Sequence, residues 1–196
     1  MKRAFDILAS GLGLIVLSPL FAILAVWIKT DSKGPVFYRQ TRVGKDNKDF
    51  RLYKFRSMRP NSDKLGLITV GGHDPRVTRS GYYIRKYKLD EFPQLINVFL
   101  GDMSLVGPRP EVRKYVDMYT PEQMKVLNVR PGITSLASIR YRNENDILAA
   151  APDPDKAYIE QVMPDKLAID LEYVGKANLL TDIKLIFSTF KEIVRH

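Results

Sequence analysis

The chain begins with a long apolar segment. From Ile7 to Ile28, none of the 22 residues carries a formal charge, and a bilayer crossing needs roughly 20 apolar residues. A cleavable signal peptide would have a shorter apolar core of about 7 to 15 residues, followed by a small-residue cleavage site that is missing here. We therefore expect this segment to form a helix in lipid.

Positive charge lies on both sides of this helix. Lys2 and Arg3 precede it, and residues 29–59 hold ten Lys or Arg against three Asp. Because positive residues near a membrane segment favour the cytoplasmic side, both ends of the helix are drawn toward the same side. A helix that enters the membrane and returns would satisfy both.

Ser18 and Pro19 lie near the middle of the segment. Proline removes one amide donor from the helix, and the Ser18 hydroxyl can bond back to Leu14, so a kink is expected here. From these residues alone, a re-entrant helix and a single-pass helix that tolerates its proline both remain open.

Two extended stretches, "VFYRQTRVG" and "FRLYKFRSM", flank the turn-rich pentapeptide 45–49. This pattern predicts a two-stranded hairpin with basic and aromatic residues interleaved. Such interleaving could suit single-stranded nucleic acid, with bases stacked on Tyr38, Phe50, Tyr53 or Phe55. No RNA-recognition pattern of glycine and aromatic residues follows, however, and hairpin aromatics are more often core residues.

Two later stretches resemble loops. Residues 60–80 are rich in Gly, Pro, Asn and Asp, which predicts a loop with His73 on its surface. Residues 145–166 combine a helical pattern, "DKAYIEQVM", with the loop "APDPD", which contains Asp153 and Asp155. An Asp-x-Asp pair can bind the metal of a glycosyltransferase, but no alternating strands and helices surround this one, so a loop is the better interpretation.

A helix is predicted from Leu89 onward. Apolar residues recur at the i, i+3, i+4 and i+7 positions that form one helix face, namely Phe92, Leu95, Ile96 and Phe99. Asp90 would then be the N-cap of this helix, and Glu91 would lie in its first turn. Capping and complementarity to the helix dipole explain both acids without any chemistry.

The same acid pair also suits catalysis. A helix N-terminus and nearby cations stabilise an ionised carboxylate and lower its pKa, so Asp90 would be charged at neutral pH. An ionised Asp can attack phosphorus as a covalent nucleophile, and a neighbouring Glu can help to hold a divalent metal.

Arginines on rigid turns follow the acid pair. Arg109 stands between Pro108 and Pro110, whose rings restrict the backbone and fix the direction of the guanidinium, which favours bidentate phosphate binding. Arg130 lies in the turn "VRPGIT", and Arg142 follows within "RYRNEND".

The last stretch, "NLLTDIKLIFSTFKEIVRH", has an amphipathic helical pattern. Its apolar residues on one side are Leu180, Ile183, Ile186, Phe187 and Phe190. Such a helix could lie on the membrane surface or pack in the core, and the pattern alone does not distinguish the two.

Composition limits the chemistry. With 45% hydrophobic and 27% charged residues among 196, the chain can form one core, so a single domain is expected. The absence of cysteine excludes disulfides, zinc-thiolate sites and thiol nucleophiles. Residues 29–59 carry a net +7 of the chain's +9, and this block calls for an anionic partner, for which phosphates on a nucleotide, on nucleic acid or on a membrane surface all qualify. A solvated basic face remains the default interpretation of any charge run taken alone.

Taken together, these motifs resemble one family. The membrane segment with Ser18-Pro19, "FYRQTRVG", "LYKFRSM", "LDEFPQLINVFLGDMSLVGPRPE", "VRPGIT" and "LLTDIKLIF" are similar to the bacterial sugar transferases called monotopic phosphoglycosyl transferases, in their minimal catalytic form. The resemblance covers nearly the whole chain. It implies a mostly helical α+β fold with a re-entrant membrane helix in residues 1–30, a small β-hairpin and interfacial amphipathic helices. Residues 31–196 would form a cytoplasmic, membrane-associated catalytic domain.

The resemblance also implies an activity. Such enzymes transfer a sugar 1-phosphate from a UDP-sugar to polyprenol phosphate, such as undecaprenyl phosphate, and release UMP. Asp90 would be the nucleophile that forms a covalent phosphosugar intermediate, and Asp90 with Glu91 would hold Mg²⁺. The cations Arg85, Arg109 and Arg142 would contact substrate phosphates, and Asp182 would be a further active-site acid.

The implied setting is the cytoplasmic face of the bacterial inner membrane. Partners would be the UDP-sugar, polyprenol phosphate, membrane lipid and downstream glycosyltransferases, with no nucleic acid. Two other classes stay open from the residues alone, namely a membrane-anchored nucleic-acid-binding protein and a non-catalytic scaffold. Residues 145–166 are longer than in the shortest family members and could shape the sugar pocket.

Overall fold

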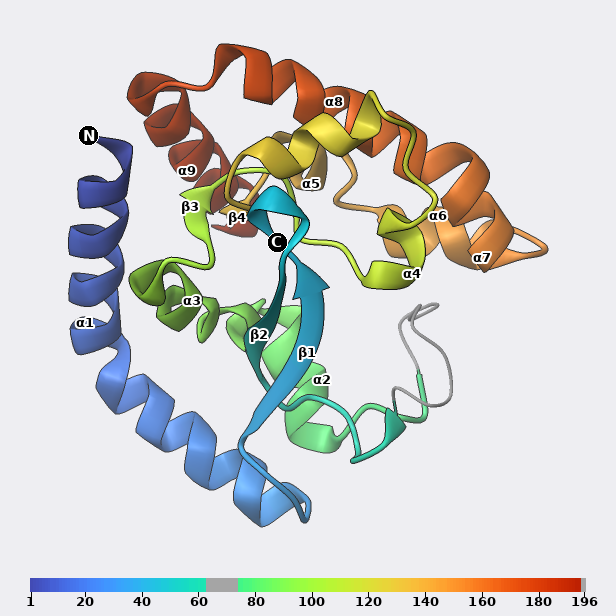
Figure 1. The fold of residues 1–196 in the computed structure, drawn as a ribbon. Helices are drawn as coiled ribbons and strands as arrows, with labels where there is room; N and C mark the ends of the chain where they lie inside the picture. Colours follow the sequence, from blue (N-terminus) through green and yellow to red (C-terminus); the bar gives the residue numbers. More distant parts are fainter. Residues whose placement is uncertain (63–73, 195–196) are drawn as a thin grey trace.

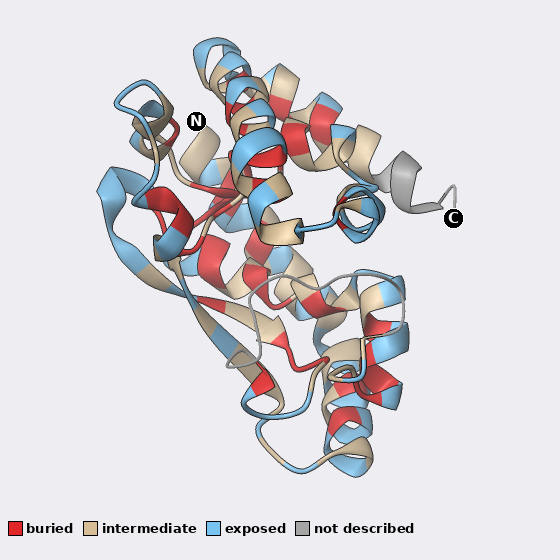
Figure 2. Ribbon diagram, turned by 90° about the vertical axis from the view of Figure 1, so that its right-hand side faces the viewer, coloured by how far each residue is buried: buried red, intermediate tan, exposed pale blue. Residues whose placement is uncertain are grey.

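The computed structural model describes residues 1–62 and 74–194, so that His73, most of the predicted loop at 60–80 and the chain's last two residues lie outside the described residues. The fold is mostly helical with small strand pairs, as the mostly helical α+β prediction expected. Figure 1 shows helix α1 along one side of the molecule and the other elements gathered beside it. Figure 2 shows buried residues on the inward sides of the helices and exposed residues on their outer sides.

Helix α1 (Lys2–Asp31) is one continuous α-helix with Pro19 inside it, and it changes direction near its middle (Figure 1). The Ser18 hydroxyl donates a hydrogen bond to the Ile15 carbonyl at 2.8 Å, not to Leu14 as the sequence predicted. The reason is that Pro19 has no N–H to give to Ile15, four residues earlier, so this carbonyl is free to accept from Ser18. The Ser18 hydroxyl thus replaces the backbone hydrogen bond that Pro19 removes at the bend.

Among the described residues, α1 is the helix long and apolar enough to cross a membrane by length and composition. Its outward face consists of large apolar residues that are each more than 60% exposed, namely Leu8, Leu12, Ile15, Val16, Ile23 and Val26. A contiguous apolar face of this extent marks contact with lipid or with another protein.

The predicted hairpin is confirmed. Strands β1 (Phe37–Val43) and β2 (Asp49–Phe55) pair antiparallel, and a short turn at Lys45–Asn47 joins them. Phe55 is 1% exposed and lies between the rings of Phe21 on α1 and Phe37 on β1. This aromatic residue therefore belongs to the core and is closed to a stacked base.

The helix predicted from Leu89 is wrong in its first part. The observed elements are α2 (Arg79–Lys86), a 3₁₀ turn η3 (Leu89–Glu91) and α3 (Gln94–Leu100). Pro93 stands at the N-cap position of α3, and Asp90 caps no helix. Helix α2 begins within the range predicted as a loop, where the Thr78 hydroxyl caps it by accepting from the Gly81 N–H at 3.0 Å.

A second sheet was not predicted. Strands β3 (Ser104–Val106) and β4 (Gly132–Thr134) pair in parallel and are too short to show an alternating pattern. A Cβ atom on Gly132 would lie 2.1 Å from the Gly107 nitrogen, and one on Gly107 would lie 2.4 Å from the Arg130 oxygen. Glycine at both positions therefore lets the turn before Gly132 pack directly against the start of the Pro-Arg-Pro loop.

The C-terminal half is built from short helices. They are α4 (Arg113–Val116), η4 (Gln123–Asn128), α5 (Leu136–Arg140), α6 (Glu144–Ala150), α7 (Pro154–Ala157), the π-turn η5 (Tyr158–Val162), α8 (Met163–Lys176) and α9 (Leu179–Val194). The largest group of buried apolar residues lies here and includes Tyr115, Leu148, Tyr158 and Leu167. The predicted loop "APDPD" ends at the start of α7, where Asp153 accepts hydrogen bonds from the Asp155 and Lys156 amides.

Helix α9 divides its predicted apolar stripe between two environments. Leu185 is buried and Ile186 packs beside it, whereas Leu180 and Phe187 are 73% and 70% exposed. The core alternative therefore holds for one part of the helix, and contact of its exposed part with the membrane surface stays a prediction. The side chain of Phe190 lies outside those that the structure describes.

Candidate active site

The acid pair lies on a tight turn between α2 and α3. Lys88 adopts a left-handed backbone conformation with φ 56°, and the η3 turn follows at once. Leu89 packs against a buried group that includes Leu24 and Ile28 of α1, so this turn is fixed beside the membrane helix. Asp90 is 8% exposed, which is unusual for a charged residue without a direct partner.

Glu91 is held by two cations. Its Oε1 lies 2.5 Å from Arg109 Nη2 and 3.4 Å from Lys54 Nζ, and its Oε2 lies 3.4 Å from Arg109 Nη1. Arg109 comes from the Pro-Arg-Pro loop and Lys54 from β2, so the two ion pairs of Glu91 join three separate segments: the η3 turn, this loop and β2. The side chain of Arg109 remains 35% exposed.

The pKa values of Asp90 and Glu91 are shifted in opposite directions. Burial raises the pKa of Asp90, the positive charge of Lys54 opposes this rise, and the neighbouring Glu91 charge adds to it. Burial would also raise the pKa of Glu91, but Arg109 and Lys54 outweigh that effect and hold its pKa well below the usual range. The sequence predicted a lowered pKa for Asp90; this is corrected, because Asp90 is buried and lies at no helix N-terminus.

Asp90 is also the freer of the two carboxylates. Within residues 1–62 and 74–194, no hydrogen bond or ion pair is formed by its oxygens. Arg85, which the resemblance implied for phosphate binding, lies on α2 and acts on Asp90 through its charge, as does Lys88. An unpaired carboxylate surrounded by cations is available to an incoming phosphorus or metal ion.

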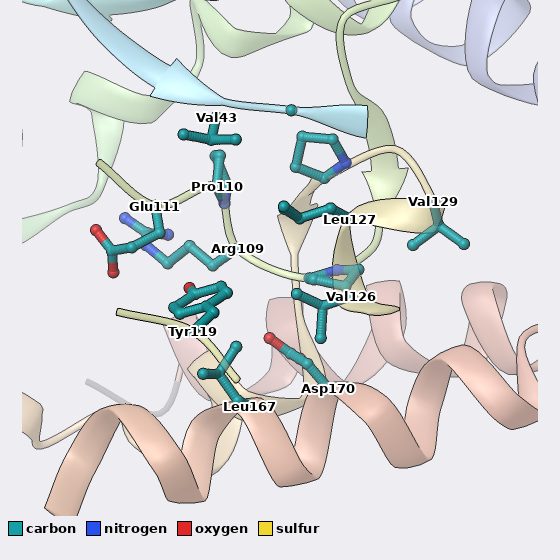
Figure 3. A pocket seen from close by; sticks show the side chains of 13 residues that line it. Val43, Arg109, Pro110, Glu111, Tyr119, Val126, Leu127, Val129, Leu167 and Asp170 are labelled. Atoms are coloured by element: carbon teal, nitrogen blue, oxygen red, sulfur yellow. The ribbon is translucent and has the colours of Figure 1, made fainter. Parts of the chain in front are cut away.

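Behind Arg109 is a small cavity of about 20 Å³, which Figure 3 shows between Arg109, Glu111, Tyr119 and Asp170. Its volume suits about one water molecule and is far below that of a nucleotide-sugar site. Asp170 of α8 is buried, and its Oδ1 has no hydrogen-bond partner. Burial raises the pKa of Asp170 to about 7.

Two further residues predicted for the site, Asp182 and Arg142, make no contact with Asp90 or Glu91 among the interactions of the described residues. Asp182 is 2% exposed, forms an ion pair with Lys2 and accepts a hydrogen bond from Tyr173 Oη at 2.6 Å. Both of its oxygens are thus engaged in joining α9 to the start of α1. Arg142 is exposed in the turn between α5 and α6, and its contact with a phosphate stays a prediction.

The residues present fit a metal that the substrate helps to bind. No group of three or more His, Asp or Glu gathers within the described part of the chain, so a cage made only of protein ligands is not found there. Mg²⁺ is commonly bound by one or two carboxylates together with substrate phosphates. Asp90 offers unpaired oxygens, and Glu91 adjoins it, which matches that donor set.

The sequence reasoning missed Lys54, Glu111 and Asp170. Lys54 was counted as one of many basic residues on the hairpin, although its place on a strand between the buried residues Leu52 and Phe55 was a usable signal. Asp170 stands in the middle of a helix between apolar neighbours, where a carboxylate is rarely buried without a reason. Nothing in the sequence marks Glu111 beyond its position after the Pro-Arg-Pro loop.

This arrangement defines a class of protein. A buried acid, a second acid held ionised and several converging cations form a site for phosphoryl groups, next to an apolar helix suited to lipid. Comparison with known proteins agrees: residues 1–196 match the family model described as bacterial sugar transferase. The chain belongs to the bacterial sugar transferase family.

Characterised relatives resemble the chain over nearly all of its length. It is 42% identical to the UDP-N-acetylgalactosamine-undecaprenyl-phosphate N-acetylgalactosaminephosphotransferase of Aeromonas hydrophila and 38% identical to the UDP-glucose:undecaprenyl-phosphate glucose-1-phosphate transferase of Escherichia coli K12, with 99% of the chain covered in each case. It spans 44% and 40% of those two proteins. It is also 41% identical to the exopolysaccharide production protein PSS of Rhizobium leguminosarum bv. phaseoli, with 96% of the chain and 92% of that protein covered.

Proposed function

We propose that this protein transfers a sugar 1-phosphate from a UDP-sugar to polyprenol phosphate, with undecaprenyl phosphate as the acceptor and UMP as the other product. The observation that carries the proposal is the unpaired, buried Asp90 next to the Glu91–Arg109–Lys54 cluster and against α1. The names of the relatives, which specify UDP-sugars and undecaprenyl phosphate, support the same substrate classes. Because those names differ in the sugar, the proposal leaves the sugar open.

The reaction proceeds in two displacements at the phosphorus that carries the sugar. An Asp90 oxygen attacks this phosphorus, the bond to the bridging oxygen breaks, and UMP departs with that oxygen. A phosphate oxygen of the polyprenol phosphate then attacks the same phosphorus, the bond to Asp90 breaks, and the polyprenyl diphosphate sugar is released. Asp90 returns to its carboxylate form, so the protein is unchanged after one cycle.

The cluster supplies the charge that both displacements need. Arg109 uses part of its five N–H donors on Glu91, and the rest can bind phosphate oxygens from its partly exposed position. Glu91 stays ionised beside Arg109 and Lys54 and thereby fixes the direction of both cations. The raised pKa of Asp90 makes this carboxylate more basic, and thus a stronger nucleophile once it is ionised.

The residues that would hold Mg²⁺ are Asp90 and Glu91. When bound, Mg²⁺ would neutralise the phosphate oxygens of the donor.

The seating of α1 supports a re-entrant helix. At its start, Lys2 Nζ donates to the Val106 carbonyl at 3.0 Å, and Asp6 accepts from the Leu105 N–H at 3.0 Å. At its end, Asp31 accepts from Ser80 Oγ at 2.7 Å. Both ends of α1 are therefore tied to one folded body, whereas a spanning helix would place its ends on opposite sides of the bilayer.

This topology predicts a labelling result. The chain has no cysteine, so single cysteines can be placed at Ala4 and at Lys45, both of which are exposed. Both should react with an impermeant maleimide in inverted inner-membrane vesicles, and neither in right-side-out vesicles. Val16→Cys, on the bend of α1, serves as the lipid control and should react only after detergent is added. Labelling of Ala4→Cys and Lys45→Cys from opposite sides would rule out re-entry.

The function itself is tested by UMP release. Purified protein in detergent or nanodiscs is incubated with Mg²⁺, undecaprenyl phosphate and one UDP-sugar at a time, including UDP-glucose and UDP-N-acetylgalactosamine. UMP is expected with at least one donor. Continuous UMP release should require the lipid phosphate, because without this acceptor the reaction stops after one UMP per protein molecule. No UMP from any donor, or steady turnover without the lipid acceptor, would contradict the proposal.

We also place the protein on the cytoplasmic face of the bacterial inner membrane. The positive charge at both ends of α1 supports this orientation. Enzymes that extend the lipid-linked sugar are the partners that this product requires, since a polyprenyl diphosphate sugar is an acceptor for further glycosyl transfer.

A further inference from the structure

The π-turn η5 directs one tyrosine toward the active-site loop. Tyr158, the first residue of this turn, is 6% exposed, and its hydroxyl donates a hydrogen bond to Glu111 Oε2. Its ring packs against Tyr115 with centroids 4.8 Å apart, and Lys166 lies over it at 5.5 Å. One-turn π segments are frequent at functional sites because they shift the side chains that follow. This turn belongs to the region 145–166, for which the sequence suggested only a role in shaping the sugar pocket.

Glu111 is the residue that this hydroxyl reaches, and it closes the Pro-Arg-Pro loop. Its Oε1 accepts from Arg42 Nη1 at 3.1 Å and from the Val112 N–H at 2.7 Å. Its carbonyl accepts from the Val43 N–H at 2.8 Å. Arg42 Nη1 also donates to the Pro110 carbonyl at 3.0 Å. Glu111 therefore attaches the end of the loop to β1 on one side and to η5 on the other.

Arg109 lies two residues before Glu111, between the two prolines, so its direction depends on how this end of the loop is held. The near end of the loop is fixed by the close approach of Gly107 to the turn before Gly132. The far end of the loop is held by the bonds to the Glu111 and Pro110 carbonyls and by the Glu111 carboxylate, whose contacts come from Arg42, Val112 and Tyr158. Burial raises the pKa of Tyr158, and the Glu111 charge adds to the rise, so the hydroxyl keeps the proton that it donates.

We infer that Tyr158 is a positioning residue for substrate phosphate binding: through Glu111 it holds the Pro-Arg-Pro loop in the conformation that presents Arg109 to the UDP-sugar. The part of this inference that concerns the substrate rests on the proposed function, and the part that concerns the loop does not. A simpler reading is that Tyr158 only fills the core, in which case its ring would matter and its hydroxyl would not.

The chain provides a matched pair of variants. Tyr158→Phe keeps the ring and removes the hydroxyl that contacts Glu111. Tyr115→Phe removes a hydroxyl from the other ring of the same pair, one that donates to Asp155 at 2.6 Å and does not reach Glu111. Both variants lose one hydrogen bond to a carboxylate near the same packed rings. Because Asp155 is more exposed than Glu111, Tyr115→Phe should lower thermal stability by no more than Tyr158→Phe does.

The first measurement needs no activity. Hydrogen–deuterium exchange of the peptide that spans residues 107–112, in purified protein, should be faster in Tyr158→Phe than in the wild type and unchanged in Tyr115→Phe. The amides that respond are those at the loop end, since Val112 N–H donates to the Glu111 side chain. Equal exchange in all three proteins, or equal acceleration in both variants, overturns the inference.

The second measurement concerns the substrate. With the UDP-sugar that gives turnover, Tyr158→Phe should raise KM about tenfold while kcat changes less, because Arg109 binds phosphate in the ground state as well as in the transition state. Tyr115→Phe should retain the wild-type KM. An unchanged KM in Tyr158→Phe overturns the inference. If the wild type itself has no turnover, the proposed function fails, and the exchange experiment alone decides whether Tyr158 fixes the loop.

Discussion

Asp90→Asn is expected to lower UMP release by at least about 10³-fold, because an amide cannot serve as the nucleophile toward phosphorus. The substitution keeps the size and shape of the side chain, and Asp90 makes no hydrogen bond or ion pair with the described residues that it would break. The loss should appear in kcat and not in KM for the UDP-sugar, since the cations that bind phosphate are left in place. Initial rates over a range of UDP-sugar concentrations provide the measurement.

This variant should also be well folded. Burial raises the pKa of Asp90 in the folded protein above its ordinary value of 3.8. The contribution of Asp90 to stability is therefore fully present below pH 3.8 and is lost as the pH rises through the raised pKa of the folded protein. At pH 8 the neutral amide avoids the cost of a buried charge, and Asp90→Asn should melt no lower than the wild type. Asp117→Asn, at a surface carboxylate that is 63% exposed, should leave turnover unchanged.

Glu91→Gln is the second substitution with a large expected effect. It leaves Arg109 and Lys54 without the charge that holds them, and it removes the second candidate ligand for Mg²⁺. We expect turnover to fall by about 10²-fold or more and the free energy of unfolding to fall by about 2 to 3 kcal/mol. The lowered pKa of Glu91 means that its contribution is full at pH 7 and decreases as the pH falls below 4.5, its ordinary value. The difference in unfolding free energy between Glu91→Gln and the wild type should therefore become smaller as the pH falls.

A double variant separates stability from chemistry. Lys54 is mostly buried, and burial lowers its pKa although Glu91 opposes that shift. Adding Lys54→Met to Glu91→Gln removes the uncompensated charge next to the new amide and should recover much of the lost stability. Turnover should not recover with it. Recovery of turnover together with stability would mean that Glu91 acts only as a structural partner of the cations.

The sequence was sufficient for elements whose residues interact locally. The apolar run at 7–28 requires a long helix whatever surrounds it, and Pro19 indicates its bend. The hairpin β1–β2 follows from two extended stretches joined by a turn in which Asp46 and Asn47 have positive φ. These features depend on a few neighbouring residues, and a single sequence records them.

The immediate surroundings of Asp90 could not be predicted in this way. The periodicity of Phe92, Leu95 and Ile96 indicated a helix, but Pro93 moved its start and left Asp90 on a 3₁₀ turn. Its burial comes from packing with α1 and β2, which lie far away in the sequence, and this tertiary packing reversed the expected direction of the pKa shift. Strands β3 and β4 escaped prediction for the same reason, since each has three residues and gains its pairing from a distant partner.

The cations of the site were only partly identified. Arg109 was predicted because two prolines fix its direction, and the structure places it against Glu91. Lys54 of β2 also contacts Glu91 and was not predicted. Asp182 was assigned to the site by resemblance, yet its contacts in the structure are with Lys2 and Tyr173. Sequence identifies which residues carry charge, but the pairing of charges depends on the fold.

The most direct test of the account is to trap the covalent intermediate. Protein incubated with Mg²⁺ and the UDP-sugar that gives turnover, without polyprenol phosphate, is quenched, digested and analysed by mass spectrometry with fragmentation of the peptide that contains Asp90 and Glu91. The account predicts a mass increase of one sugar phosphate on Asp90, its disappearance when polyprenol phosphate is added, and its absence from Asp90→Asn. An adduct on Glu91 or Asp182, or continued product formation by Asp90→Asn, would contradict the central claim that Asp90 bonds to the phosphorus.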